Sequence, residues 1–446
     1  MIELYLSEVA PVLNATLLGD DVKFTGCNTD TRKITPGSIY VALRGENFDG
    51  HKFVSVAEKN GASAVIVEQA VADCNLPCLC VDDTRKALGS LAKFWLEQFK
   101  LPLVAITGSN GKTTTKEMLR AIFAENVLAN QGNFNNDIGV PLTLFNLNAT
   151  HQQAVIEMGA NHAGEIGYLT QLAPPNVATI TQCAPAHLEG FKTIKGVALA
   201  KGEIFSNLQA DGIAVINNDD DYAELWRDLA APHTISTFAI KNDADVKATQ
   251  IQLNAASSDF NLKTPTGDIT IHLPLPGQHN IMNALAASAC ALASGCSLNT
   301  IKNGLETMQS VKGRLQLCKG INDSTIINDT YNANPTSLNA ALMVLQQSNA
   351  PRILVLGDMN ELGSQSVEFH QQAGKQAREF GVESLLTIGE LSKNAADSFG
   401  EGAKHFEQHA DLNKYLQKIS TNATILVKGS RGMKMETIVN ALQEKI

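Results

Sequence analysis

Short apolar runs rich in β-branched residues recur along this chain of 446 residues and alternate with helix-like stretches. The runs show no polar–apolar alternation and are bounded by Gly, Asn or Asp, which is typical of strands buried on both faces of a parallel sheet. The runs that we interpret as such strands are residues 38–43, 64–67, 103–107, 154–157, 177–181, 213–216, 353–356 and 424–427. Strands that alternate with helices predict βαβ units, so we expect an α/β fold with doubly wound sheets.

One stretch, residues 234–275, departs from this pattern. Polar and apolar residues alternate there and the helix signal is weak, which predicts a small antiparallel sheet on the side of a larger domain. A new strand–loop–helix series begins after Pro102, and another begins after residues 311–314. At roughly 150 residues per domain the length suggests about three domains, and we expect the central one to be large. Their expected ranges are residues 1–82, 83–312 and 313–446.

Charge and composition exclude several classes of protein. The formal net charge of −10 argues against a protein that binds nucleic acid by neutralising its phosphate backbone. Residues 1–8 are acidic where a signal peptide needs positive charge, and no apolar run approaches the ~18 residues of a membrane span. The Cys-x3-Cys-x-Cys spacing at residues 74–80 is not a zinc spacing, and we expect all eight cysteines to be reduced and mostly buried. We therefore expect a soluble cytoplasmic protein with no nucleic-acid partner and no membrane span.

The strongest local signal is a Gly-rich turn between a buried strand and a helix. After residues 103–107 come Gly108, Gly111 and then Lys112 and Thr113. Glycines let backbone N–H groups converge on phosphate oxygens, and the helix N-terminus adds a partial positive charge. The lysine can reach the β/γ-phosphates and the threonine hydroxyl can bind Mg²⁺. The candidate nucleotide-binding residues of this loop are Thr107, Gly108, Ser109, Asn110, Gly111, Lys112, Thr113 and Thr114.

This loop departs from the usual Gly-x4-Gly-Lys-Thr pattern, because only Ser109 and Asn110 separate its glycines. The alternative is an ordinary Gly-rich turn with an exposed lysine. The ordered strand, loop and helix favour a phosphate site over that alternative. The loop alone suits ATP or GTP, and the absence of an Asn-Lys-x-Asp run for guanine favours ATP.

The shortened loop, Thr107 to Thr115, resembles the ATP loop of the Mur ligase family, whose ATP-dependent amide-bond ligases build the peptide stem of bacterial peptidoglycan. Further segments resemble the family's motifs in the same order, namely residues 132–141, 155–161, 186–189, 200–205 and 277–284. The resemblance covers nearly the whole chain. It implies a small N-terminal UDP-binding domain, a central P-loop-like ATP-binding domain with a mostly parallel sheet, and a Rossmann-like C-terminal ligase domain.

The resemblance also implies a magnesium-dependent catalytic centre. Lys112, Glu157, His187 and Lys201 would be catalytic, and Thr113 would join the last three as a Mg²⁺ ligand. In the family the lysine at the position of Lys201 is carbamylated by CO2. From the residues alone, the carboxylate of Glu157 needs a partner because it ends a buried strand. The imidazole of His187 is not a favoured Mg²⁺ ligand when neutral. Lys201 is expected to be an ordinary solvated helix residue. The roles of His187 and Lys201 therefore rest on the family match.

Four further residues match positions that hold ATP in the family. Asn280 and Asn283 lie at the start of an expected helix and would contact adenine, or alternatively cap and flank that helix. Arg314 matches an interdomain phosphate-binding arginine, and Asp329 matches a ribose-binding aspartate. Because both would come from the third domain, domain closure would complete the site and exclude water.

Two segments, residues 328–337 and 357–363, are similar to the branch of the family that adds D-alanyl-D-alanine to UDP-N-acetylmuramoyl-tripeptide. The Asp-Asn-Pro-Arg run of the preceding ligase is absent. Residues 30–32 and 37–51 resemble the UDP-binding module, and we expect the protein to be a monomer. The implied substrate-binding residues are Asp30, Thr31, Arg32, Arg44, Gly45, Asp49, His51, Asn135, Asn136, Tyr331, Asn332, Asn334, Ser337, Lys428 and Arg431.

Several rival functions share part of this pattern. The ligase that adds the third stem residue and folylpolyglutamate-type ligases have the same core, but residues 331–337 argue against both. A P-loop ATPase acting as a conformational switch would hydrolyse ATP without the carboxylate and amine substrates that a ligase needs. A non-enzymatic nucleotide-binding module would need no separate magnesium ligands. We therefore expect an ATP-dependent ligase that forms a C–N bond through an acyl phosphate and releases ADP and phosphate.

Overall fold

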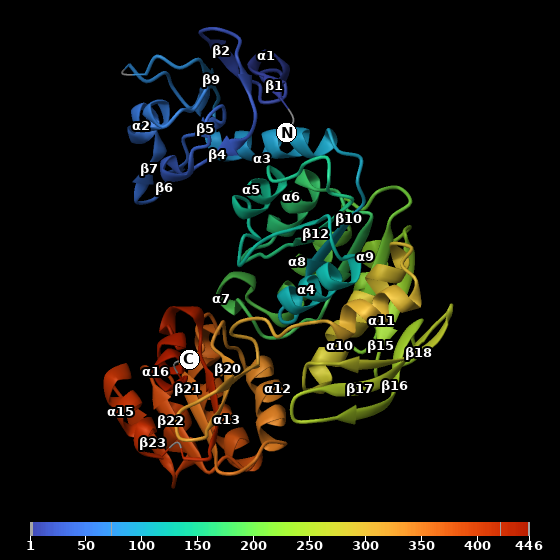
Figure 1. Ribbon diagram of the computed structural model, residues 1–446, viewed down its shortest axis with the longest axis vertical. Coiled ribbons are helices and arrows are strands. Elements are labelled where there is room, and N and C mark those ends of the chain that lie inside the picture. Colours follow the sequence, from blue (N-terminus) through green and yellow to red (C-terminus); the bar gives the residue numbers. More distant parts are fainter. Residues whose placement is uncertain (1–2, 73, 420, 445–446) are drawn as a thin grey trace.

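Figure 1 shows a computed structural model of the protein, which describes residues 3–72, 74–419 and 421–444. Three α/β bodies follow one another along the longest axis, from the N-terminal region through the central region to the C-terminal region (Figure 1). The predicted three-domain α/β architecture is confirmed. The first two residues of the acidic N-terminal stretch lie outside the described residues.

The N-terminal domain is built on a five-stranded sheet. Its strands follow the order β2 (Thr16–Leu18), β9 (Cys78–Cys80), β8 (Ala64–Val67), β5 (Ile39–Val41) and β4 (Cys27–Asn28). All pair in parallel except β2, which is antiparallel to β9. Smaller elements are β1 (Leu4–Tyr5), α1 (Leu6–Val9), β3 (Lys23–Phe24), β6 (Arg44–Gly45), β7 (Phe48–Asp49) and α2 (Val54–Lys59).

Helix α3 (Thr84–Glu97) connects this domain to the central domain. Its N-terminus is capped by Asp83, whose carboxylate accepts hydrogen bonds from the N–H groups of Arg85 and Lys86. Trp95 on its buried face packs edge-on against Phe145 of the central domain, with ring centroids 5.9 Å apart. The guanidinium of Arg85 also pairs with the carboxylate of Asp137.

Nine strands form the central sheet. Their order is β11 (Val127–Ala129), β12 (Gln153–Glu157), β10 (Leu103–Thr107), β13 (Val177–Ile180), β14 (Ile213–Asn217), β15 (Thr234–Ala239), β16 (Val246–Leu253), β17 (Ser258–Thr264) and β18 (Gly267–Leu273). The pairings from β11 to β16 are parallel and the last two are antiparallel. The antiparallel stretch was expected as a side sheet, but it continues the main sheet, because buried Phe238 of β15 pairs with buried Val246 of β16.

Helices cover both faces of this sheet. One face carries α4 (Lys112–Phe123), α10 (Gln278–Ala293) and α11 (Leu298–Glu306), and the other carries α5 (Gly139–Leu144), α6 (Glu165–Leu172), α8 (Ile194–Gly202) and α9 (Ala223–Ala230). Along β10, Leu103 and Ala105 face one core while Val104 and Ile106 face the other. Burial on both faces explains why this strand is apolar from Leu103 to Ile106.

The C-terminal domain has a six-stranded sheet. Its order is β19 (Gln316–Lys319), β20 (Thr325–Asp329), β24 (Thr424–Lys428), β21 (Arg352–Gly357), β22 (Ser384–Ile388) and β23 (Ala403–Phe406), with only edge strand β19 antiparallel. The helices are α12 (Pro335–Gln346), α13 (Ser366–Glu379), α14 (Lys393–Phe399), α15 (His409–Ile419) and α16 (Glu436–Leu442). The loops after β20 and β21 contact the central domain through Asn334 and Glu361. Ligands of open α/β sheets bind at this carboxyl edge.

Two other expectations can be compared with the structure. All eight cysteines are free, as expected. Cys27, Cys78 and Cys290 are buried and the other five are partly buried, so fewer thiols are fully buried than we expected. Within the described residues, the helices are too short or too polar to cross a membrane.

Candidate active site

The Gly-rich turn lies between β10 and α4, as the sequence predicts, and close packing explains its glycines. Gly108 and Gly111 have φ values of 148° and 84°, which side chains rarely adopt. A Cβ at Gly108 would lie 1.9 Å from Oγ1 of Thr181, and a Cβ at Gly111 would lie 2.2 Å from Oδ1 of Asn283. The turn is therefore held tightly between β13 and the start of α10.

Lys112 begins α4 and folds back over the turn. Its Nζ donates a 2.6 Å hydrogen bond to the carbonyl of Gly108. Burial lowers the pKa of this amine, Glu157 opposes that shift, and the nearby cation of Arg314 adds to it. A phosphate anion placed at the loop would relieve both unfavourable effects, since it would pair with the ammonium group.

Glu157 ends β12 beside the turn and is only 3% exposed. Its carboxylate accepts 2.8 Å hydrogen bonds from Oγ1 of Thr113 and from Nδ2 of Asn135. The Thr113 hydroxyl also accepts a 2.9 Å hydrogen bond from Arg314. Thus two predicted magnesium ligands, Thr113 and Glu157, lie in direct contact.

The donor set at this point suits Mg²⁺. A hydroxyl and a carboxylate are hard oxygen donors, and Mg²⁺ is usually bound by one or two such groups together with water and substrate phosphates. Among the described residues, no three His, Cys, Asp or Glu side chains converge as a metal cage, and Mg²⁺ bound to a nucleotide does not need one. The other two predicted ligands, His187 and Lys201, share no hydrogen bond or ion pair with Thr113 or Glu157 within the described residues.

His187 instead contacts the third domain. It adopts the left-handed conformation at φ 54°, just before α7 (Leu188–Phe191). Its Nδ1 lies 2.6 Å from Oε2 of Glu361, and the N–H of Leu188 donates to the Glu361 carbonyl at 3.0 Å. The hydrogen bond with His187 lowers the pKa of the Glu361 carboxyl. Glu361 therefore links two domains, a role that the sequence analysis missed.

Lys201 is buried rather than solvated, which corrects the interpretation from the residues alone. Its side chain is 3% exposed on α8, and it forms no ion pair among the described residues. Burial, together with the nearby cation of Lys112, lowers the pKa of its amine to about 7. A substantial fraction of this amine is therefore neutral and nucleophilic at neutral pH.

The predicted adenine-contacting asparagines lie at the start of α10. Asn280 and Asn283 are 6% and 8% exposed. Asn280 donates to the carbonyl of Pro276 at 2.8 Å, and Asn283 donates to Oδ1 of Asn280 at 3.4 Å. His279, which the sequence analysis did not single out, lies near Asp329 of the third domain, and burial lowers its pKa to about 4.

Arg314 bridges the second and third domains. Its guanidinium stacks on the ring of Tyr331 at 4.2 Å while it donates to Thr113. Its Nε is buried and has no hydrogen-bond partner among the residues that the structure describes. A buried unpaired donor is costly, and an anion such as a phosphate would satisfy it.

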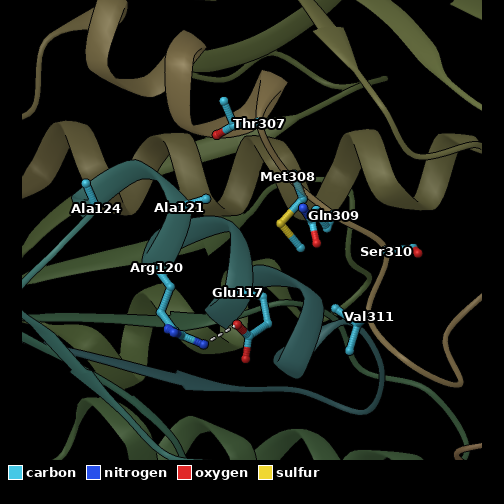
Figure 2. A pocket seen from close by; sticks show the side chains of 9 residues that line it. All are labelled: Glu117, Arg120, Ala121, Ala124, Thr307, Met308, Gln309, Ser310 and Val311. Carbon is cyan, nitrogen blue, oxygen red and sulfur yellow. Dashed lines mark hydrogen bonds and ion pairs between the residues drawn. The ribbon is translucent and has the colours of Figure 1, made fainter.

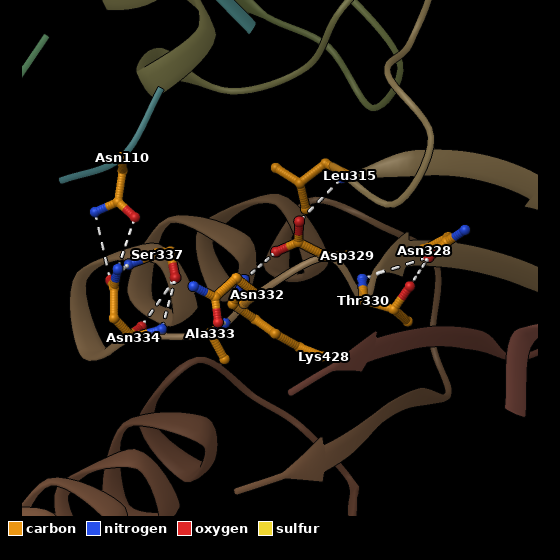
Figure 3. A network of polar contacts seen from close by, with 10 residues as sticks. All are labelled: Asn110, Leu315, Asn328, Asp329, Thr330, Asn332, Ala333, Asn334, Ser337 and Lys428. Atoms are coloured by element: carbon orange, nitrogen blue, oxygen red, sulfur yellow. Dashed lines mark hydrogen bonds and ion pairs between the residues drawn. The ribbon is translucent and has the colours of Figure 1, made fainter. Parts of the chain in front are cut away.

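Figure 3 shows the polar network of the third domain that faces the turn. The Lys428 ammonium is 1% exposed, pairs with Asp329 and donates to the Asn332 carbonyl at 3.0 Å. Asn334 caps α12 by accepting from the N–H of Ser337 at 2.9 Å and donates to Oδ1 of Asn110 at 2.7 Å (Figure 3). The predicted residues of this region are therefore brought together, and their polar groups are largely satisfied by one another.

Three models of known protein families match the chain. They are the Mur ligase family catalytic domain over residues 23–95, the Mur ligase middle domain over residues 106–291, and the Mur ligase glutamate ligase domain over residues 313–431. The chain is also 43% identical to the UDP-N-acetylmuramoyl-tripeptide--D-alanyl-D-alanine ligase of Escherichia coli (strain K12), over 100% of this chain and 99% of that protein. The chain belongs to the Mur ligase family.

Solved structures agree with this placement. A crystal structure of MurF from Acinetobacter baumannii matches this Mur ligase with a TM-score of 0.95 and 38% identity, over 100% of both chains. The MurF ligase of Thermotoga maritima, solved in complex with ADP, matches with a TM-score of 0.84 and 25% identity, over 93% of this chain and 96% of that one.

The predicted UDP-binding residues of this Mur ligase lie in two local networks. Asp30 pairs with Arg32 at 2.8 Å, and hydrogen bonds from Arg32 lower the Asp30 pKa to about 2. In the second network, Nδ1 of His51 lies 2.8 Å from Asp49, whose pKa it lowers, while Nε2 of His51 accepts from the N–H of Glu68. The guanidinium of Arg44 also pairs with Glu68 at 2.7 Å.

The remaining predicted residues of the Mur ligase lie as follows. The Asn136 side chain accepts a hydrogen bond from the N–H of Gly139, the first residue of α5. Thr31 begins a short 3-10 helix that also contains Arg32, and Gly45 follows Arg44 in β6. Arg431 is exposed, with its guanidinium 6.0 Å from the Tyr331 ring. A pocket of about 390 Å³ lies beside α4, lined by Glu117, Arg120 and residues 307–311 among others, and includes none of the predicted site residues (Figure 2).

Replacing Asn334 separates its capping role from its contact with the turn. We expect Asn334→Ala to lower the free energy of unfolding by about 1 kcal/mol, because α12 loses its N-cap. Asn334→Asp keeps a capping oxygen but cannot donate to Asn110, so it should retain most of the stability. Thermal unfolding followed by circular dichroism measures both, and an equal loss in the two variants would contradict the capping explanation.

Proposed function

We infer that this Mur ligase joins D-alanyl-D-alanine to UDP-N-acetylmuramoyl-tripeptide, at the expense of ATP, in peptidoglycan precursor synthesis. The observation that carries this inference is the 43% identity, over essentially both full lengths, to an Escherichia coli ligase named for that reaction. The residues of the shortened phosphate loop and the contacts around Lys112 and Glu157 support it.

The proposed reaction begins with the terminal carboxylate of the tripeptide attacking the γ-phosphorus of ATP, so that ADP leaves and an acyl phosphate forms. The amine of D-alanyl-D-alanine then attacks the acyl carbon, the C–O bond to phosphate breaks, and the amine loses a proton to solvent. Two anions must meet in the first step. Lys112 and Arg314, from two different domains, would balance that charge at the loop.

We propose that Thr113 and Glu157 hold Mg²⁺, which would neutralise the phosphates when bound. We propose that Lys201 is carbamylated, because its buried amine with a pKa of about 7 can react with CO2 as the neutral form. The carbamate would turn this cation into a carboxylate. His187 is proposed to reach the metal only when it leaves Glu361, since the pair joins two domains at 2.6 Å.

We propose that Asn280, Asn283, Asp329 and Arg314 hold the rest of ATP, supported by the burial of the first three and of the Arg314 Nε atom. The UDP group would lie on the N-terminal networks of Asp30 and His51. Asn135 and the loops after β20 and β24 would hold the peptide ends, a role for which the network of Lys428 must partly open.

We propose working domain boundaries at residues 82/83 and 312/313, supported by the start of α3 at Thr84. A monomer acting in the cytoplasm remains our expectation.

Phosphate release is the direct test of this function. The assay contains ATP, MgCl2, UDP-N-acetylmuramoyl-tripeptide and D-alanyl-D-alanine, and each is omitted in turn. We expect sustained release only when all are present, because the acyl phosphate forms on one substrate and is consumed by the other. Equal release without the tripeptide or without D-alanyl-D-alanine would indicate a switch ATPase and contradict the proposal.

A further inference from the structure

A buried lysine of α4 has no role in the reaction described above. Lys116 follows Lys112 by about one helical turn and is only 1% exposed. Its ammonium donates a 2.7 Å hydrogen bond to the backbone carbonyl of Asn130 and lies 3.2 Å from Oε1 of Glu117. Burying a charged lysine is unfavourable unless its donors are paired, so these contacts fix both the lysine and the backbone of Asn130.

Asn130 in turn binds the backbone of Glu157. Its side chain is buried, its Oδ1 accepts from the Glu157 N–H at 2.9 Å, and its Nδ2 donates to the Glu157 carbonyl at 2.7 Å. The ladder between β11 and β12 ends with Ala129 opposite Val155, just before this point. The amide of Asn130 therefore substitutes for the next peptide group of β11 where the chain turns away, and it holds the end of β12 in register.

The same side chain also organises the loop that contacts the Glu157 carboxylate. Nδ2 of Asn130 donates to the carbonyl of Phe134 at 2.9 Å. The next residue is Asn135, whose Nδ2 donates to Oε1 of Glu157 at 2.8 Å. Oε2 of Glu157 receives the hydroxyl of Thr113, on the same helix as Lys116. Asn130 thus connects the three segments that surround this carboxylate.

We propose that Asn130, fixed by Lys116, is a positioning residue that aims the Glu157 carboxylate at Mg²⁺. The inference rests on the proposed magnesium role of Glu157 and Thr113. Groups that orient a metal ligand without touching the metal typically contribute 10–100-fold, or about 1.4–2.8 kcal/mol, to metal affinity. Neither residue touches nucleotide or metal in this account, so the effect of replacing them should be confined to metal-dependent steps.

Calorimetric ADP binding, with and without MgCl2, tests the proposal apart from turnover. In Asn130→Ala we expect the gain in ADP affinity that Mg²⁺ provides to fall by about 10-fold or more, while metal-free ADP affinity changes by less than about two-fold. The matched control is Asn207→Ala, which removes an amide that bonds Thr170 at 2.9 Å elsewhere in the same domain. This control should retain the full Mg²⁺ effect.

Two more variants keep the test decisive. Lys116→Met, which removes the ammonium but retains an unbranched side chain, should show the same selective loss if Asn130→Ala does not fold. An unchanged Mg²⁺ effect in both folded variants, or an equal loss of metal-free binding, would overturn the positioning role. Glu157→Gln separates this failure from that of the proposed site: if it also retains the Mg²⁺ effect, the magnesium assignment itself is wrong.

Discussion

Lys112→Ala is expected to lower kcat by about 10²–10³ at saturating ATP without unfolding the protein. Removing one preorganised positive group from a site where negative charge accumulates typically has this effect on rate. In the structure the amine already folds over the turn and contacts Gly108 at 2.6 Å, so it is positioned before the phosphates arrive. The measurement is phosphate release at saturating substrates, with circular dichroism to confirm the fold.

Lys263→Ala is the matched control for this variant, because Lys263 is an exposed lysine on β17 of the same domain. It should turn over at the wild-type rate. A folded Lys112→Ala protein with wild-type turnover would remove Lys112 from the mechanism.

Lys201→Ala is expected to lower kcat by a similar factor of about 10² or more, because the proposed carbamate, which would support the proposed metal site, cannot form. Small carboxylates such as acetate should restore part of the activity by occupying the position of the missing anion. The wild-type enzyme, assayed with the same carboxylates, should show no gain. The structure supports this expectation because Lys201 is buried and forms no ion pair among the described residues.

The pH dependence expected for the proposed carbamylation follows from the same lysine. Only the neutral amine reacts with CO2, and burial lowers the pKa of Lys201 to about 7. After removal of CO2 at low pH, the rate of reactivation at a fixed concentration of dissolved CO2 should therefore rise through pH 7 and level off above it, whereas an unperturbed lysine would keep gaining up to pH of about 10. Full activity of Lys201→Ala, together with an unmodified lysine in a crystal structure of the wild type, would contradict the proposal that Lys201 is carbamylated.

The strands that the sequence predicts correctly are those buried on both faces. Residues 103–106 and 353–356 are apolar at every position because helices cover both sides of their sheets, and each run lies within a strand of the structure. The sequence could not show that β16 to β18 continue the central sheet. That continuity depends on Phe238 pairing with Val246, and a local alternation pattern does not specify the neighbouring strand.

The candidate site is only partly predictable for a similar reason. The turn from Gly108 to Thr113 has a local signature, because strand, glycines, lysine and helix occur in order. Lys116 and Asn130 have none: each looks like an ordinary polar residue until the fold buries it. Glu361 lies within a motif that the sequence analysis noted, but its contact with His187 depends on how two domains meet.

The central claim is that D-alanyl-D-alanine, and not a free diamino acid, is the attacking amine. D-alanyl-D-alanine has a single carboxylate and no second amine. These features suit the neutral side chains of Asn332 and Asn334 beside the basic residues Lys428 and Arg431. A site built to pair one set of polar groups discriminates strongly against a ligand with a different set. The decisive measurement compares phosphate release with UDP-N-acetylmuramoyl-tripeptide plus D-alanyl-D-alanine against UDP-N-acetylmuramoyl-dipeptide plus a diamino acid. We predict turnover with the first pair and none with the second. Turnover with the second pair and none with the first would contradict the account and identify the enzyme as the neighbouring ligase.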